Sequence, residues 1–111
     1  MDEINVNGEI YRKVSAATTE YSIIRTESAG VHFGKITRRE GKEVELVDAR
    51  RIWYWEGAAS LSQMAVSGVS KPKTCKFSVT VPHILLTEAI EIIVCTQVAT
   101  KCILEVPEWK A

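Results

Sequence analysis

Hydrophobic and polar residues alternate along several short stretches of the chain, which is the pattern of half-buried β-strands. The stretches YSIIRTE (21–27) and VHFGKIT (31–37) each predict a strand, with a turn at SAG between them. A second turn is expected at RREGKE, with Gly41 at its tip. The β-branched and aromatic run VELVDARRIWYW (44–55) then predicts one long or bent strand, which Gly57 ends.

Beyond this strand the pattern predicts a short helix and a further strand. The Ser-x-x-Gln capping pattern that begins at Ser60 indicates a helix over residues 61–66, ended by Gly68. The stretch CKFSVTV (75–81) alternates strictly and predicts a half-buried strand that Pro82 closes. His83 then falls in an expected loop.

The segment ILLTEAIEIIVC (84–95) fits both a helical stripe and strand alternation. Its β-branched residues favour a strand at 89–94. Thr96 is then expected to cap a helix that runs to about Leu104. The inner face of that helix is predicted to carry Val98, Cys102 and Ile103.

These elements predict an α+β fold, a small single domain that is mainly antiparallel β-sheet with one or two short helices. The chain of 111 residues, 46% of them hydrophobic, suits one domain spanning 1–111. Within it we expect an N-terminal hairpin, with Asn7-Gly8 as its turn, and a connection in 1–20. The core is expected in 21–104, followed by a C-terminal tail, 105–111, that can dock back.

The formal net charge is zero, but residues 25–76 hold ten Lys and Arg against six Asp and Glu. This stretch presents either a basic face or an ordinary mixed surface. Cys75, Cys95 and Cys102 are an odd number in apolar surroundings, which favours buried free thiols in a reducing compartment. The polar N-terminus and the lack of a run of ~20 apolar residues predict an intracellular protein without a membrane span.

The run ARRIWYW (49–55) carries the densest candidate chemistry. Alternate residues of a strand share one face. The run therefore divides into Arg51, Trp53 and Trp55 on one face and Arg50, Ile52 and Tyr54 on the other. With Ile52 and Tyr54 inward, the first face is an exposed strip whose indoles stack on nucleobases and whose guanidinium binds phosphate. The alternatives are tryptophans that fill the core and a subunit interface.

A second candidate is RTESAGVHFG (25–34). The Ser28-Ala29-Gly30 turn can present backbone N–H groups to an anion, with Arg25 before it and His32 after it, or it is only a turn. The glycine spacings of nucleotide-binding loops are missing. The chain has two histidines, no nucleophile elbow and no clustered metal ligands, so we expect no enzyme, no cofactor and no metal site.

The strings RTESAGVHFG, ARRIWYWEGAASLSQMA and LTEAIEII resemble a family of small uncharacterised proteins of tailed bacteriophages. The resemblance runs from about Ile23 to Cys95 and departs at Glu27, where an aromatic is expected, and at Val94, where proline is expected. It implies a phage accessory protein in the cytoplasm of the host bacterium. Several phage proteins of this size form oligomers that sequester nucleotide second messengers of bacterial immunity, an analogy of class.

The leading hypothesis is a homo-oligomeric anti-defence protein that binds and sequesters a small nucleotide. The expected ligand-binding residues are Arg25, Ser28, Ala29, Gly30, His32, Arg50, Arg51, Trp53 and Trp55. One alternative is a protein–protein interaction module, as a host-factor inhibitor or virion component, with the Arg/Trp surface as its hot spot. Another is single-stranded nucleic-acid binding, which the zero net charge disfavours.

Overall fold

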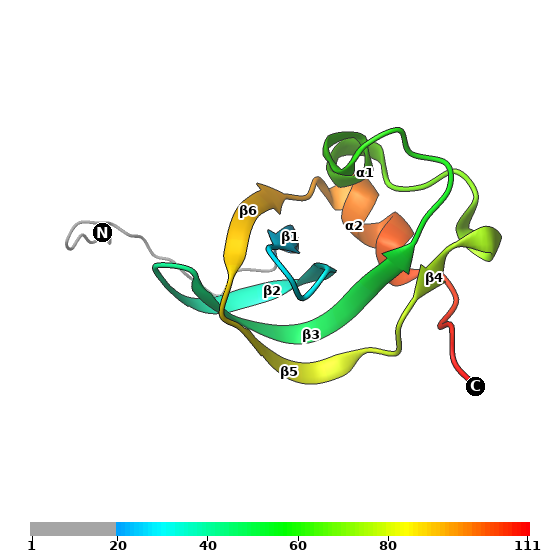
Figure 1. The fold of residues 1–111 in the computed structure, drawn as a ribbon. Coiled ribbons are helices and arrows are strands. Elements are labelled where there is room, and N and C mark those ends of the chain that lie inside the picture. The colour runs from blue at the N-terminus through cyan, green and yellow to red at the C-terminus, as the bar shows by residue number, and fades with distance from the viewer. Residues whose placement is uncertain (1–19) are drawn as a thin grey trace.

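The computed structural model describes residues 20–111, which form one antiparallel sheet of six strands with two short helices on one of its faces (Figure 1). The strands are β1 (Ser22–Thr26), β2 (Val31–Glu40), β3 (Glu43–Tyr54), β4 (Lys76–Phe77), β5 (Val81–Leu86) and β6 (Ala89–Val94). The helices are α1 (Leu61–Ser67) and α2 (Gln97–Leu104), with a 3-10 turn η1 (Pro72–Thr74) between β3 and β4. The α+β prediction is confirmed.

The sheet has the order β4-β3-β2-β1-β6, and β5 pairs with the same edge of β3 as β4 does. β5 and β6 therefore follow each other in the chain but pair with opposite ends of the sheet. At their junction the amide of Ala89 donates to the carbonyl of Lys42 (3.0 Å), and the amide of Glu27 donates to the carbonyl of Glu88 (3.0 Å). The junction thus ties both ends together, and the sheet curls into a partly closed barrel (Figure 1).

Strand alternation sends neighbouring residues of β1 into two separate cores. Ile24 points inside the curl of the sheet, and Ile23 points to the face covered by α1 and α2. The inner core also contains Val44, Leu46, Ala49, Leu86 and Ala89. The core under the helices includes Phe33, Ile52, Met64, Ala65, Phe77, Ala99 and Ile103.

Both predicted helices begin where their capping residues indicate. The hydroxyl of Ser60 accepts from the amide of Gln63 (3.1 Å), and the hydroxyl of Thr96 accepts from that of Ala99 (3.1 Å). The predicted inner face of α2 is correct for Ile103 and wrong for Val98, which is 70% exposed. Ala99 takes the inner position because it lies one turn before Ile103 and shares its stripe.

The predicted strand at 75–81 is wrong, because the chain there forms two strands with a break at 78–80. Ser78 causes the break: its hydroxyl accepts from the amide of Arg51 (2.8 Å) and donates to the carbonyl of Val79 (2.8 Å). Pro82 and His83 lie within β5. The expectations that Pro82 closes a strand and that His83 falls in a loop are therefore wrong. β5 tolerates Pro82 because an edge strand leaves outward N–H positions unpaired.

The ambiguous segment resolves as predicted, since β6 occupies 89–94 as a strand. The C-terminal tail docks on β4, where the amide of Trp109 donates to the carbonyl of Phe77 (2.8 Å). The expected N-terminal hairpin lies outside the described residues. Across residues 20–111, no helix has the length and apolar character needed to cross a bilayer.

Candidate functional site

A β-bulge at Trp53 decides how the aromatic run is displayed. Ile52 pairs with Phe77 and Tyr54 pairs with the adjacent Lys76, so Trp53 has no residue opposite it on β4. Alternation is lost from this point. Trp53 is 61% exposed and Tyr54, which was expected to point inward, is 44% exposed. The expectation for Tyr54 is therefore wrong.

The same bulge separates the two tryptophans that were expected to share a face. Trp55 is only partly exposed and packs against the core under the helices, where its Nε1 donates to the carbonyl of Ala58 (3.2 Å). The expected strip of Trp53 beside Trp55 does not form. Trp53 instead lies against Trp109 from the C-terminal tail.

An exposed cluster of four side chains replaces that strip, and we call Trp53, Tyr54, Lys76 and Trp109 the aromatic patch. The rings of Trp53 and Trp109 are nearly parallel, 16° apart with centroids separated by 6.3 Å. The Lys76 ammonium lies 5.3 Å from the centroid of Trp109 and 5.8 Å from that of Tyr54. Trp109 is 48% exposed. The patch joins β3, β4 and the tail into one surface.

Arg50 is placed inside the molecule and not on that surface. Its guanidinium donates to the backbone carbonyls of Ser78 (2.9 Å), Ile103 (2.8 Å), Phe77 (3.3 Å) and Pro107 (3.4 Å). Desolvation lowers the pKa of Arg50, and the charge of Glu108 acts in the opposite direction. Arg50 thus ties β4, α2 and the tail together, and its donors are occupied by the protein itself.

Arg51 is exposed, and no ion-pair partner of its side chain is found within residues 20–111. It lies opposite His32 across the β2–β3 pair. His32 is fully buried, its Nε2 donates to the carbonyl of Ala29 (3.0 Å), and its Nδ1 has no hydrogen-bond partner. Burial lowers the pKa of His32; the bond to Ala29 raises it, and the charge of Arg51 lowers it further.

The turn between β1 and β2 forms as predicted, with Gly30 at a φ of 87°. Its donors, however, serve the turn itself. The amide of Ala29 donates to the hydroxyl of Thr26 (2.9 Å), and the hydroxyl of Ser28 donates to the carboxylate of Glu88. A carboxylate beside the turn disfavours an anion there.

Arg25 is likewise engaged, because its Nε donates to the carboxylate of Glu91 (2.9 Å). Ile24, and not Arg25, is in register with His32, so Arg25 lies on the opposite face of the sheet from Arg51. The structure therefore brings His32, Ala29 and Arg51 together. It does not bring Arg25 to Arg51.

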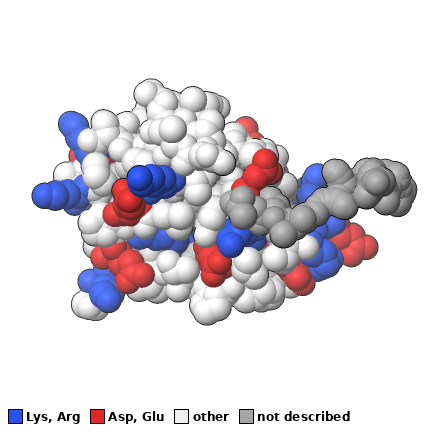
Figure 2. Space-filling view, turned by 180° about the vertical axis from the view of Figure 1, so that it is seen from behind, with Lys and Arg blue, Asp and Glu red and all other residues white. Residues whose placement is uncertain are grey.

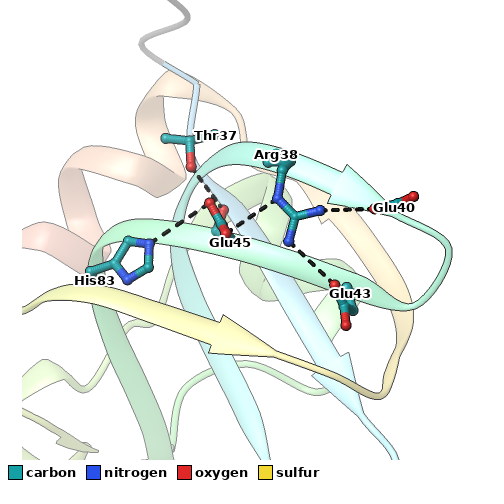
Figure 3. A network of polar contacts seen from close by, with 6 residues as sticks. All are labelled: Thr37, Arg38, Glu40, Glu43, Glu45 and His83. Atoms are coloured by element: carbon teal, nitrogen blue, oxygen red, sulfur yellow. Dashed lines mark hydrogen bonds and ion pairs between the residues drawn. The ribbon is translucent and has the colours of Figure 1, made fainter.

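A second polar cluster surrounds Arg38 on the outside of β2, β3 and β5 (Figure 3). Its guanidinium contacts Glu40 (3.2 Å), Glu43 (3.3 Å) and Glu45 (3.2 Å), and His83 lies 3.8 Å from Glu45. Hydrogen bonds to Glu43 and Glu45 raise the pKa of Arg38. In the part of the chain that the structure describes, no three or more His, Cys, Asp or Glu side chains could hold a metal ion. This cluster ties strands together.

A groove of about 520 Å³ runs along α2, lined by Glu20, by the loop before α2, by residues of α2 and by Glu105 after it. None of the expected ligand-binding residues lines it. Cys95 opens onto this groove but is mostly buried, and burial raises the pKa of its thiol to about 11. Cys75, Cys95 and Cys102 are all free, and Cys102 is half-buried, so the prediction of free thiols is confirmed and that of burial holds for two of the three.

Acidic and basic side chains lie side by side on the face seen in Figure 2. Three members of the aromatic patch were missed as site residues in the sequence. Tyr54 was assigned to the wrong face, Lys76 carried no pattern, and Trp109 lay in a tail expected only to dock. The one available signal was a third tryptophan close to a chain end that could return to the sheet.

A family model described as Domain of unknown function (DUF6948) matches residues 19–103. The matched span contains Arg51, Trp53, Tyr54 and Lys76 and ends before Trp109. No curated protein and no solved structure matches the chain.

Proposed function

The chain belongs to the family described as Domain of unknown function (DUF6948), and we propose that it is a nucleotide-binding protein without catalytic activity. The observation that carries the proposal is the exposed pair of parallel indole rings, Trp53 and Trp109, with the Lys76 ammonium beside it. Indole faces stack on nucleobases with a gain of ~1–3 kcal/mol per base. Ammonium and guanidinium groups bind phosphate.

Arg51 supplies a phosphate contact next to this stacking surface. It lies two residues before Trp53 on β3, a distance of roughly 7 Å along a strand. Its guanidinium has no carboxylate partner among the described residues, so its charge is available to a ligand. A nucleotide with its base on Trp53 and its phosphate at Arg51 uses both groups.

This assignment is narrower than the one made from the sequence. Arg51 and Trp53 are kept, and Trp109 and Lys76 are added. Arg50 and Trp55 are omitted because they pack inside the molecule, and Arg25 and Ser28 because glutamates occupy them. His32, Ala29 and Gly30 support the strand that carries Arg51 and are not assigned a ligand contact.

The proposed complex includes a second copy of the chain. One base on one open face gains ~1–3 kcal/mol. A micromolar dissociation constant needs about 8 kcal/mol in total. A homo-oligomer in which two aromatic patches face each other provides stacking on both faces of the base and closes the site to water.

The biological setting that we propose is the cytoplasm of a bacterium infected by a tailed phage. The support is the resemblance of RTESAGVHFG and ARRIWYWEGAASLSQMA to small phage proteins. A protein that captures a nucleotide signal of host immunity there acts by lowering the free concentration of that signal. Such a role needs tight binding and no chemistry.

A thermal-shift panel of mononucleotides, cyclic dinucleotides, cyclic ADP-ribose isomers and short oligonucleotides tests the proposal. We expect at least one class to raise the melting temperature of the wild-type protein. Trp53→Ala and Arg51→Gln should abolish that shift while keeping the wild-type melting temperature within a few degrees, since both side chains are exposed. Arg25→Gln is the matched control and should keep the shift. A flat panel with wild-type protein contradicts the proposal.

A protein–protein interaction module is the second candidate, favoured by the clustering of Trp53, Tyr54 and Trp109 at one exposed site. Tryptophan and tyrosine are enriched among residues that dominate interface energetics. A flat nucleotide panel, together with one stoichiometric host protein captured by the wild type and lost with Trp53→Ala, would support this candidate instead.

A further inference from the structure

We infer that the ligand of the aromatic patch carries two phosphates, one on each side of a stacked base, and is therefore a dinucleotide unit and not a mononucleotide. The inference rests on the proposed function and specifies its ligand class. It follows from the positions of two cationic side chains, Arg51 and Lys76, relative to Trp53.

Arg51 lies on β3 and Lys76 lies on the neighbouring strand β4, where it pairs with Tyr54 near the end of β3. Arg51 is paired with Ser78, since its amide and carbonyl both bond to that residue, whereas Lys76 is in register with Tyr54. Because of the bulge, the two positions are two residues apart along β4 and three along β3, a separation of roughly 7 to 10 Å. Trp53 lies between them on the bulge.

Neither of these cations is neutralised by a carboxylate among the described residues. Two carboxylates lie close by, but neither forms an ion pair with Arg51 or Lys76. Glu56 accepts from the hydroxyl of Tyr54 (2.6 Å), and Glu108 pairs with Lys110 (3.6 Å) and accepts from the amide of Thr80 (3.4 Å). Arg51 and Lys76 are thus two positive charges beside the aromatic patch that have no ion-pair partner among the described residues.

Lys76 is also held in place, unlike most surface lysines. Its ammonium lies over the faces of both Tyr54 and Trp109, which restricts the side chain without cancelling its charge. A phosphate bound there meets a cation that has already lost much of its rotamer freedom. A mononucleotide monophosphate can satisfy Arg51 or Lys76, but a unit with two phosphates can satisfy both.

Two sources share this chemistry, a free dinucleotide and a segment of a single strand. The test is a tryptophan-fluorescence titration of the full chain with thymidine monophosphate, the linear dinucleotide pTpT, cyclic di-AMP and (dT)12. We expect pTpT to bind at least tenfold more tightly than thymidine monophosphate. Tighter binding of cyclic di-AMP than of (dT)12 identifies a free dinucleotide as the source, and the reverse order identifies a strand.

Lys76→Gln and Arg51→Gln should each weaken pTpT binding about tenfold, to the level of thymidine monophosphate. Arg39→Gln, an exposed arginine on the β2–β3 hairpin, is the matched control and should change nothing. If (dT)12 binds, the slope of log affinity against log salt concentration should be about −1.4 for two phosphate contacts and about −0.7 in Lys76→Gln. Urea midpoints equal to that of the wild type verify folding.

The outcomes separate this inference from the proposed function. Equal affinity for thymidine monophosphate and pTpT, or pTpT binding that Lys76→Gln leaves unchanged, overturns the two-phosphate inference alone. Absence of binding by every probe overturns the nucleotide-binding proposal together with it.

Discussion

At the scale of single residues, His32 is the most unusual side chain in the described part of the sheet. It is fully buried, one ring nitrogen donates to Ala29, and the other has no partner. Protonation would place a charge in the core near the guanidinium of Arg51, and the pKa of His32 is accordingly lowered, chiefly by burial. Folding therefore selects the neutral imidazole.

This lowered pKa predicts that the protein loses stability as the pH falls below neutrality. The unfolded chain, with a histidine pKa of about 6.5, binds a proton before the folded protein does. The free energy of unfolding should hold steady above pH 7 and decline as the pH falls from about 6.5 to the lower folded-state pKa of His32. Urea unfolding of the wild type, His32→Gln and His83→Gln between pH 8 and 5.5 measures this. The decline should persist in His83→Gln, and a decline that also persists in His32→Gln would refute the assignment.

At the scale of elements, irregularities in the strands decide what the surface displays. The bulge at Trp53 exposes that ring and turns Trp55 toward the core. The loop after β3 includes a close approach, since the amide of Ser70 donates to the carbonyl of Gly57 (3.2 Å). Gly57 has a φ of 89°, and a Cβ there would lie 2.5 Å from the backbone nitrogen of Ser70. No other residue fits this position.

Two glycine substitutions separate backbone strain from steric clash. Gly41 also has a positive φ, of 59°, but a Cβ there meets nothing within 4 Å. Gly41→Ala should therefore cost about 1 kcal/mol in the free energy of unfolding, which is the strain alone. Gly57→Ala should cost about 3 kcal/mol or more, because Ser70 must also move. Equal losses for the two variants in urea denaturation would show that the contact with Ser70 is dispensable.

At the scale of the whole molecule, the C-terminal tail completes both the fold and the aromatic patch. Pro107 accepts from the buried Arg50, Glu108 accepts from Thr80, and Trp109 donates to Phe77. The stability of the β4 edge and the geometry of Trp53 are thus linked to the last few residues of the chain.

Truncation after Val106 tests this link. Loss of the tail's three hydrogen bonds should lower the free energy of unfolding by about 3 kcal/mol, at roughly 1 kcal/mol for each bond. Nucleotide binding should be lost as well, because Trp109 is removed. Trp109→Ala should lose the binding with a much smaller loss of stability. Urea unfolding and fluorescence titration measure the two effects, and a truncated chain that binds like the wild type would exclude the tail from the site.

Local signals in the sequence were sufficient for most elements. Ser60 and Thr96 mark helix starts because a capping hydroxyl acts within one turn, and Gly41 marks a hairpin because the turn needs its backbone freedom. The prediction of one strand over residues 75–81 failed at Ser78. Val79 and Val81 continue the alternation of the sequence, but the hydrogen bonds of the Ser78 hydroxyl interrupt the strand. A hydrogen bond to backbone that is distant in the sequence, such as that from the amide of Arg51 to Ser78, cannot be predicted from neighbouring residues.

The candidate site was predicted in part. The features set by neighbouring residues were predicted, and those set by contacts between distant segments were not. The sequence by itself determined that arginine and tryptophan residues alternate along one strand, because alternation depends on near neighbours, and it left open which of them are exposed. Only the tertiary structure decided that Arg50 is buried beneath the tail, that a bulge separates Trp53 from Trp55, and that Trp109 meets Trp53. Each of these depends on contacts between segments more than twenty residues apart, which no local pattern encodes.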